Sequence, residues 1–222
     1  MARTRALDYD EKRQAILRRS VSVIAERGVE RASMAQIALE CGVSKALLYH
    51  YYTSKEELVY DILSSYLENL DAVIADADNP ELPPVERLRH LVYTTLDHYR
   101  DSDDQHKVQI SAMRALPADK VETLREIERS IVQRFATVIE SVNPALADDR
   151  PRLMPVTMSL FGMMNWVYMW FRVEGPLSRN ELADLMTQLI INGVQSLDER
   201  PHPVSRAQPS AGRGTVGHSP VQ

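Results

Sequence analysis

The sequence of 222 residues has little cysteine, little glycine and no long apolar run. The single cysteine, Cys41, excludes an intrachain disulfide and fits a reducing cytoplasm. Only 8 glycines are present, and most of them follow residue 174, so the preceding chain has few of the turns that join β-strands. No apolar run reaches the roughly 18 residues that a membrane span needs, and the polar N-terminus lacks the apolar segment of a secretory signal. The low cysteine and glycine content and the absence of a long apolar run together favour a soluble, helical, cytoplasmic protein.

Charge is unevenly divided along the chain. The whole sequence has a formal net charge of −5. Residues 1–55 carry 10 basic and 6 acidic side chains, whereas residues 56–222 carry 16 basic and 25 acidic side chains. A basic N-terminal part on an acidic body attracts a polyanion such as DNA to the N-terminal part and repels it from the body.

Apolar spacing and capping signals predict an all-α fold of about nine helices, with no strand pattern and no internal repeat. The pairs Ser33–Gln36, Ser54–Glu57 and Ser178–Glu181 have the spacing of a capping box, and Asp119 with Glu122 is expected to cap a further helix. Gly28 and Gly42 are expected to end the first two helices. The expected helices cover about residues 8–27, 34–41, 45–51, 55–77, 85–99, 106–115, 119–142, 153–173 and 179–197.

Residues 33–55, SMAQIALECGVSKALLYHYYTSK, predict a helix-turn-helix. Two short helices joined at a tight glycine turn form this motif, and its second helix enters the major groove of DNA. Leu48 and Tyr52 lie one helical turn apart, and we expect them to pack inward with Val43, Ile37 and Ala38. The other side chains of the second helix are hydroxyls, a cation, an imidazole and a small apolar group, which suit phosphate oxygens, base edges and thymine methyls. These residues are Ser44, Lys45, Ala46, Tyr49 and His50.

A second distinctive segment, MPVTMSLFGMMNWVYMWFR at residues 154–172, is apolar on nearly every side. A helix of this kind must be buried on more than one side, one inside its own domain and another against a second subunit. The last helix supplies a partner stripe of Leu182, Leu185, Met186, Leu189, Ile190 and Val194. Two helices from each subunit would then make a four-helix dimer interface. The alternative is that methionine and aromatic side chains line a pocket for a flexible apolar ligand.

The N-terminal motif resembles the TetR family of bacterial one-component transcriptional regulators over about residues 12–62. The resemblance rests on Gly28, residues 33–38, 42–44 and 48–49, Tyr52 and residues 54–58. It implies a homodimer that binds a palindromic double-stranded DNA operator. It also implies a DNA-binding domain at 1–55 and a ligand-binding and dimerisation domain at 56–197, paired through the helices at about 153–197. The Pro-, Ser- and Gly-rich segment 198–222 is expected to be a disordered tail.

Carried over by position, the resemblance implies a set of DNA contacts at the starts of the two short helices and along the second. Lys55 would be a phosphate anchor at a helix N-terminus. Leu47 is an unusual residue for the major groove of DNA. Its side chain would contact a thymine methyl or only pack against other side chains of the protein. The implied DNA-binding residues are Ser33, Met34, Ala35, Ser44, Lys45, Ala46, Leu47, Tyr49, His50, Tyr51 and Lys55.

The pattern from Asn165 to Phe171, followed by residues 174–178, is similar to a TetR subgroup whose effectors are acyl-CoA or other CoA thioesters. It implies a repressor released by a small hydrophobic effector, with Arg114 or Arg172 pairing with a CoA phosphate. The implied ligand-binding residues are Gln109, Met113, Arg114, Asn165, Trp166, Met169 and Trp170. The alternative is a TetR-like regulator of an efflux or other catabolic gene with a non-CoA hydrophobic ligand, and the acidic body favours that alternative mildly.

Other classes of function find less support in the sequence. The histidines and carboxylates come with no glycine phosphate loop and no metal-spaced cluster, so we expect no enzymatic activity, no cofactor and no metal site. His98 and His106, on either side of a polar corner, come nearest to a metal pair. A pure protein-interaction role for the apolar helix is a further alternative. Cys41 is a redox sensor or a buried small hydrophobe, and we expect the second.

Overall fold

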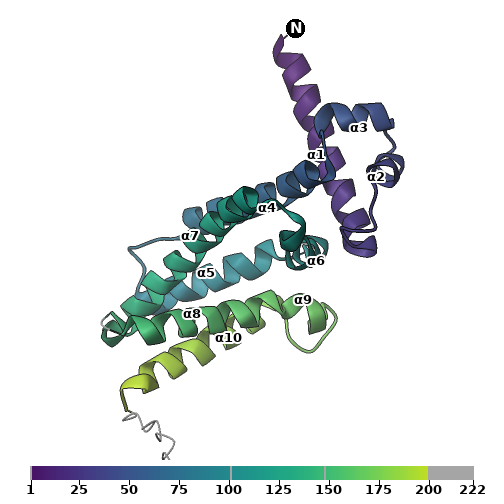
Figure 1. Cartoon of the computed structure of the whole chain (residues 1–222). Helices are drawn as coiled ribbons and strands as arrows, with labels where there is room; N and C mark the ends of the chain where they lie inside the picture. The colour runs from purple at the N-terminus through teal and green to yellow at the C-terminus, as the bar shows by residue number, and fades with distance from the viewer. Residues whose placement is uncertain (1, 101, 148, 200–222) are drawn as a thin grey trace, which may run out of the picture.

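The computed structural model describes residues 2–100, 102–147 and 149–199, and all regular structure in these ranges is helical (Figure 1). The predicted all-α fold is thereby confirmed. The first two residues of the predicted tail, 198 and 199, belong instead to a short 3₁₀ helix, and the rest, from residue 200 onward, lies outside the described residues. The α-helices are α1 (Ala2–Arg27), α2 (Met34–Glu40), α3 (Lys45–Tyr51), α4 (Lys55–Ala77), α5 (Pro84–His98), α6 (Asp103–Ala112), α7 (Ala118–Val142), α8 (Arg150–Asn165), α9 (Val167–Trp170) and α10 (Arg179–Gln195). Short 3₁₀ helices cover Met113–Ala115, Pro144–Leu146 and Ser196–Glu199.

The head consists of α1, α2, α3 and the first turns of α4. Ser33 and Gln36 form the predicted capping box at the start of α2, and Gly42 ends the helix with a φ of +69°. This left-handed conformation favours glycine because it has no Cβ. Ile37 and Leu48 are fully buried between the helices. The predicted helix-turn-helix is therefore present, with its two short helices packed on α1.

Helix α4 joins the head to the body, as Figure 1 shows. Ser54 caps it through the backbone N–H of Glu57. The predicted reciprocal box is wrong in its second half, because the Glu57 carboxylate accepts from the N–H and hydroxyl of Thr53 instead of from Ser54. Along α4, Leu58 belongs to the core of the head and Ile74 to the core of the body. A shift of α4 therefore changes the packing of both hydrophobic cores.

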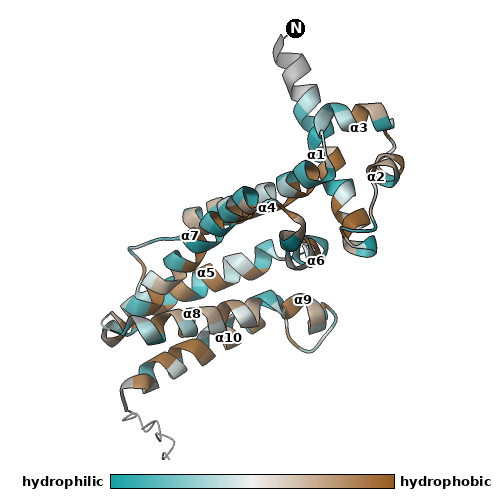
Figure 2. Cartoon of the chain, in the orientation of Figure 1, coloured by the Kyte–Doolittle hydropathy of each residue, from teal (hydrophilic) through white to brown (hydrophobic). Residues whose placement is uncertain are grey.

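In the body, the second half of α4 packs on α5 and α7, and these two helices pack in turn on α8 and α10 (Figure 1). Figure 2 shows hydrophobic residues along the inner sides of these helices. Phe135 of α7 and Phe161 of α8 meet edge to face with ring centroids 5.0 Å apart, and both are buried. The core of the head also receives Val108 and Ala112 of α6. Helix α6 is therefore shared between the head and the body.

Several predicted helix boundaries are wrong, among them the starts of α6 at Asp103 and of α8 at Arg150. Helix α1 begins at Ala2, several residues before the expected start. Pro117, not Asp119, is the N-cap residue of α7 and makes no side-chain cap, because the proline ring has no hydrogen-bond acceptor. The apolar helix breaks at Trp166 and resumes as the short α9, so that it does not continue to Val173. No helix in the described ranges is long and apolar enough to cross a membrane.

A partly buried ion pair fixes the far end of α4. Asp78, just after α4, accepts from Nε and Nη2 of Arg87 at 2.5 and 2.9 Å and from Nη1 of Arg134 at 3.4 Å. The side chain of Asp78 is only 9% exposed. The hydrogen bonds from Arg87 hold the pKa of the Asp78 carboxyl below its usual value. The ionised carboxylate thus ties α4 to α5 and α7.

Replacing Asp78 by Asn is expected to destabilise the body by about 2–3 kcal/mol at pH 7, because two arginines lose a charged acceptor. The lowered folded-state pKa means that the wild-type stabilisation is complete above the unfolded pKa of about 4 and is lost as pH falls through the folded value. Urea unfolding at pH 7 and at pH 3 measures this difference. The exposed neighbour Asp76, changed to Asn, is the control. Equal destabilisation by both variants would contradict the assignment.

Candidate DNA interface and effector cavity

The outer face of α3 is the candidate DNA-reading surface. Ser44 caps the helix by accepting from the N–H of Leu47 at 3.0 Å, and Leu48 anchors it in the core. Lys45 and Tyr49 are exposed one turn apart, with the Lys45 ammonium 5.7 Å from the centroid of the Tyr49 ring. This face offers a cation and a phenol to phosphate oxygens and base edges. The predicted residues that are exposed in the head are Ser33, Ala35, Ser44, Lys45, Ala46, Leu47, Tyr49 and His50.

Three other predicted DNA-binding residues have internal roles in the head. Met34 is 7% exposed and packs in the core. The ring of Tyr51 stacks on Tyr9 of α1 with centroids 4.6 Å apart, which leaves Tyr51 half-buried. The Lys55 ammonium donates to the carbonyl oxygens of Val29 at 2.6 Å and Glu30 at 3.4 Å. The Lys55 ammonium is therefore engaged by backbone carbonyl oxygens within the head.

A carboxylate on α4 connects the recognition helix to the rest of the head. Tyr52, the residue that ends α3, donates its hydroxyl to Oδ2 of Asp61 at 2.6 Å. Arg13 of α1 donates from Nε to the same oxygen at 2.9 Å and from Nη2 to Oδ1. The Ser65 hydroxyl donates to Oδ1 at 3.3 Å. Asp61 thus fixes α1 and the end of α3 to the helix that enters the body, and sequence patterns gave no signal for this contact.

Replacing Asp61 by Asn is expected to weaken DNA binding about 10-fold without changing the oligomeric state of the free protein, because charge-assisted hydrogen bonds from Tyr52 and Arg13 are lost together. Fluorescence anisotropy with DNA and sedimentation of the free protein measure the two quantities. Glu68→Gln, exposed farther along α4, is the matched control. Unchanged DNA affinity in Asp61→Asn would contradict the positioning role.

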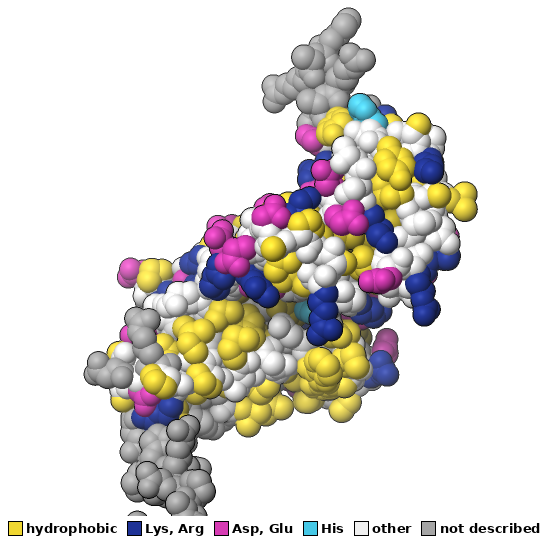
Figure 3. Space-filling view, in the orientation of Figure 1, with side chains coloured by type: hydrophobic (Ala, Val, Ile, Leu, Met, Phe, Trp, Pro, Cys, Tyr) yellow, Lys and Arg dark blue, Asp and Glu magenta, His cyan; other side chains and the backbone are white. Residues whose placement is uncertain are grey.

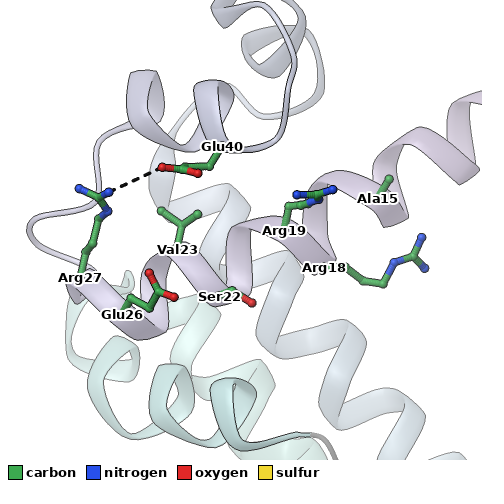
Figure 4. A pocket seen from close by; sticks show the side chains of 8 residues that line it. All are labelled: Ala15, Arg18, Arg19, Ser22, Val23, Glu26, Arg27 and Glu40. Carbon is green, nitrogen blue, oxygen red and sulfur yellow. Dashed lines mark ion pairs between the residues drawn. The ribbon is translucent and has the colours of Figure 1, made fainter.

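A groove on the outer side of α1 gathers further charge in the head. Figure 4 shows Arg18, Arg19 and Arg27 around it, with Arg27 directed to Glu40 at the end of α2. The Arg27–Glu40 pair is 3.6 Å apart, and both side chains are about half exposed. The groove is wide and shallow and has no buried polar group, so we assign no ligand to it. Its arginines contribute to the positive charge of the head.

Cys41 is half-buried beside this groove. Its sulfur lies 3.7 Å from the Ser20 hydroxyl and 3.8 Å from the Ile16 carbonyl oxygen. Burial raises the pKa of the Cys41 thiol, which disfavours the reactive thiolate. The environment agrees with a packing residue, although the side chain is less buried than the sequence suggested.

The body contains a cavity of about 180 Å³ between α4, α6, α7 and α8. Two hydrogen-bonded pairs supply its polar groups: Gln109 Nε2 donates to Glu128 Oε1 at 2.7 Å, and the Tyr99 hydroxyl donates to Asn165 Oδ1 at 2.8 Å. The rest of the lining is apolar and consists of Leu67, Leu70, Ile131, Val132, Met158 and Phe161.

The cavity includes two of the seven predicted ligand-binding residues, Gln109 and Asn165. Met113 packs instead against the core of the head, and Arg114 is exposed. Trp166, Met169 and Trp170 are more than half exposed and lie outside the cavity lining, because the break after α8 turns them outward. Sequence reasoning missed Glu128, Ile131 and Val132, although their spacing places them on one face of α7.

Beside the cavity, His106 is buried among aromatic rings. Its Nδ1 lies 3.1 Å from the Ser102 carbonyl oxygen, and its ring meets Tyr99 and Tyr168 at centroid distances of 4.4 and 5.6 Å. Burial lowers the pKa of His106. His98 lies near the same cluster, but the described residues contain no group of three or more potential metal ligands. The neutral imidazole packs as part of the wall next to Tyr99.

An exposed apolar surface covers α8, α9 and α10. We call it the α8–α10 face, and Figure 3 shows hydrophobic side chains gathered on the lower part of the molecule in this region. It consists of Met154, Met158, Trp166, Met169, Trp170, Leu185 and Leu189, each at least 41% exposed. Within the predicted stripe of α10, Leu182, Met186, Ile190 and Val194 pack inside the body. Exposed large apolar side chains gathered on neighbouring helices are characteristic of an interface.

Comparisons with known proteins match both parts of the chain. Residues 16–62 match the model described as bacterial regulatory proteins, tetR family, and residues 81–194 match the one described as tetracyclin repressor-like, C-terminal domain. A TetR-family transcriptional regulator from Bordetella parapertussis is 30% identical, with a TM-score of 0.76 over 83% of this chain and 96% of that chain.

Two further relatives carry functional names. The HTH-type transcriptional repressor KstR2 of Mycobacterium tuberculosis is 24% identical over 83% of this chain and 94% of its own length. The solved complex of AibR with isovaleryl coenzyme A and operator DNA is 24% identical, with a TM-score of 0.65 over 80% of this chain and 97% of that chain. The AibR likeness by itself shows a shared fold.

Proposed function

Since the chain belongs to the TetR family of bacterial transcriptional regulators, we propose that it is a homodimeric repressor released from its operator by a small acyl-CoA or related CoA thioester. The observation that carries the effector part is the cavity of about 180 Å³, because one of its lining residues lies on α6, a helix that also packs in the core of the head.

DNA recognition is assigned to α3. Lys45 and Tyr49 present their polar groups outward while Leu48 holds the helix in place. In a dimer, two such helices enter successive major grooves of a pseudo-palindrome, roughly 35 Å apart. We assign DNA binding to residues 1–55 and effector binding with dimerisation to residues 56–197.

Dimerisation is assigned to the α8–α10 face. Trp166, Trp170, Leu185 and Leu189 would pack on the same residues of a second copy in a two-fold interface. Large aromatic side chains at such a surface contribute most of the association energy. The dimer fixes the distance between the two recognition helices.

The size of the cavity favours a short acyl group. Taking the roughly 30 Å³ that a water molecule occupies in the liquid as the size of one heavy-atom group, the cavity holds about six such groups. An isovaleryl group is of this size, and AibR binds isovaleryl coenzyme A. The apolar walls of Leu70, Ile131 and Phe161 suit a branched hydrocarbon.

Release follows from the position of α6. Gln109 lines the cavity, and on the same helix Val108 and Ala112 pack in the core of the head. A ligand that displaces Gln109 moves α6 relative to α1 and α4 and changes the spacing of the two heads. It does so only if it binds the released state more tightly than the DNA-bound state.

The second candidate keeps the same site and mechanism with a non-CoA hydrophobic effector. It is favoured by the exposed position of Arg114, which lies outside the cavity lining, and by the acidic Glu128 within that lining. Neither feature assists the binding of a CoA phosphate.

Anisotropy of labelled operator DNA with isovaleryl-CoA, butyryl-CoA, octanoyl-CoA and free CoA tests the proposal. We expect the two short thioesters to weaken operator binding at least about 10-fold, a coupling typical of allosteric proteins, and free CoA to have no effect. Val132→Trp, which fills the cavity, should abolish the response, whereas Gln133→Trp on the exposed side of α7 should retain it. A response to free CoA alone, or an undiminished response in Val132→Trp, would contradict the assignment.

A further inference from the structure

Among the polar side chains that line the body cavity, acidic and basic groups are not balanced. Glu128 is the only carboxylate among its lining residues, and the lining contains no Lys, Arg or His. One oxygen of Glu128 accepts a hydrogen bond from Gln109 at 2.7 Å. The other polar pair is neutral, since the Tyr99 hydroxyl donates to Asn165. The cavity therefore has one strong acceptor, and its partner is an amide on a different helix.

The Glu128 carboxylate restricts which ligand groups can bind next to it. A ligand that displaces water or Gln109 from a carboxylate without donating a hydrogen bond leaves a charged acceptor unsatisfied. The loss of one hydrogen bond to a charged group corresponds to roughly 10- to 100-fold in affinity. An anionic ligand group would in addition meet a like charge.

Gln109 is the exchangeable partner of Glu128. It is a neutral side chain on α6, whereas Glu128 lies on the long helix α7 beside the buried residues Ile131 and Phe135. A ligand donor that takes the place of the Gln109 amide leaves Glu128 satisfied and cuts the hydrogen bond between α6 and α7. Recognition of the donor and release of α6 are then the same event.

We propose that Glu128 selects effectors that place an alcohol, amide N–H or ammonium donor in the cavity, and that this donor replaces Gln109. The inference rests on the proposed function only in taking this cavity as the effector site. It defines a ligand class, a compact hydrocarbon group with a hydrogen-bond donor at one end. An acyl-CoA thioester meets it through the single amide N–H that lies two carbons beyond the thioester sulfur, or through a hydroxyl on the acyl chain.

Three probes with the same ring and number of heavy atoms test the rule: cyclopentylamine, cyclopentanol and cyclopentanone. The first two carry a donor, and the ketone only accepts. Ligand-observed NMR titration of the full chain gives their dissociation constants. We expect the amine and the alcohol to bind wild-type protein at least about 10-fold more tightly than the ketone.

Two variants test whether the preference for donor-bearing probes over the ketone arises from the Glu128–Gln109 pair. Glu128→Gln should reduce the preference for the amine over the ketone at least about 10-fold, because the new amide can both donate and accept. Gln109→Met should strengthen amine binding, since the carboxylate then has no internal donor. Glu126→Gln, exposed on the same helix, is the matched control and should keep the wild-type order. Thermal unfolding of each variant establishes that it is folded.

The inference is overturned if the ketone binds wild-type protein as tightly as the alcohol, if no probe binds, or if Glu128→Gln keeps the wild-type order. A separate outcome concerns the proposed function alone. If the probes follow the donor rule while neither they nor the CoA thioesters change operator affinity, the site selects donors as inferred and the effector role fails.

Discussion

Replacing Leu189 by Asp is expected to convert the dimer into a monomer and to reduce operator affinity by about 100-fold or more. Leu189 is one of the two exposed leucines that α10 contributes to the α8–α10 face, lies one turn from Leu185, and is 56% exposed in the single chain. In a two-fold interface one substitution places two carboxylates in an apolar contact, where neither has a partner.

The loss of operator affinity follows from the geometry of two linked heads. Each head alone contacts one half-site, and linking two such contacts raises the overall affinity by roughly 10²- to 10⁴-fold. Sedimentation velocity and operator anisotropy measure the two effects on the same sample. Gln195→Asp, exposed on another side of α10, is the control and should remain dimeric. A monomeric Leu189→Asp that binds the operator as tightly as wild type would contradict the interface.

The second large effect is expected from Lys45→Ala combined with Tyr49→Ala, which should weaken operator binding by about 100-fold. Both side chains are exposed on α3 and neither is needed for the core, so the loss comes from the interface itself. The Lys45 variant alone should lower the slope of log K against log salt by about one, because one phosphate contact is lost.

Operator anisotropy at several salt concentrations checks this second prediction. Lys107→Ala on α6, where the ammonium pairs with Asp104, removes a cation from the body and serves as the control. If the control lowers operator affinity as much as the α3 variant, the loss of affinity comes from the change in net charge. In that case α3 is not the helix that recognises the operator.

The head could be predicted closely because its signals are local. A capping box, a glycine at positive φ and one-turn apolar spacing determine α2 and α3 within residues that are neighbours in sequence. The same signals could not show that Met34 is buried or that the Lys55 ammonium is held by the carbonyl oxygens of Val29 and Glu30. Those contacts join segments that are distant in sequence, and only the packed structure brings them together.

The body was harder to predict for the same reason. The apolar helix was expected to continue past Trp166, but it breaks there and turns Trp166 and Trp170 outward. Pattern alone does not distinguish an interface aromatic from a pocket aromatic, because both satisfy the same spacing. The sequence does not single out Glu128, because a charged residue on an amphipathic helix is ordinarily exposed to solvent. The hydrogen bond that Glu128 accepts from Gln109 at 2.7 Å joins two helices that are distant in sequence, so the local pattern does not indicate it.

The most direct test of the central claim is the binding of this protein to the DNA upstream of its own gene. The account predicts a sequence-selective complex that weakens steeply with salt, contains one or more dimers, and is lost in the Lys45→Ala, Tyr49→Ala variant. It also predicts that a short-chain CoA thioester or a donor-bearing cavity ligand releases the complex. Binding that is equal for operator and unrelated DNA, or that persists in the α3 variant, would contradict the account.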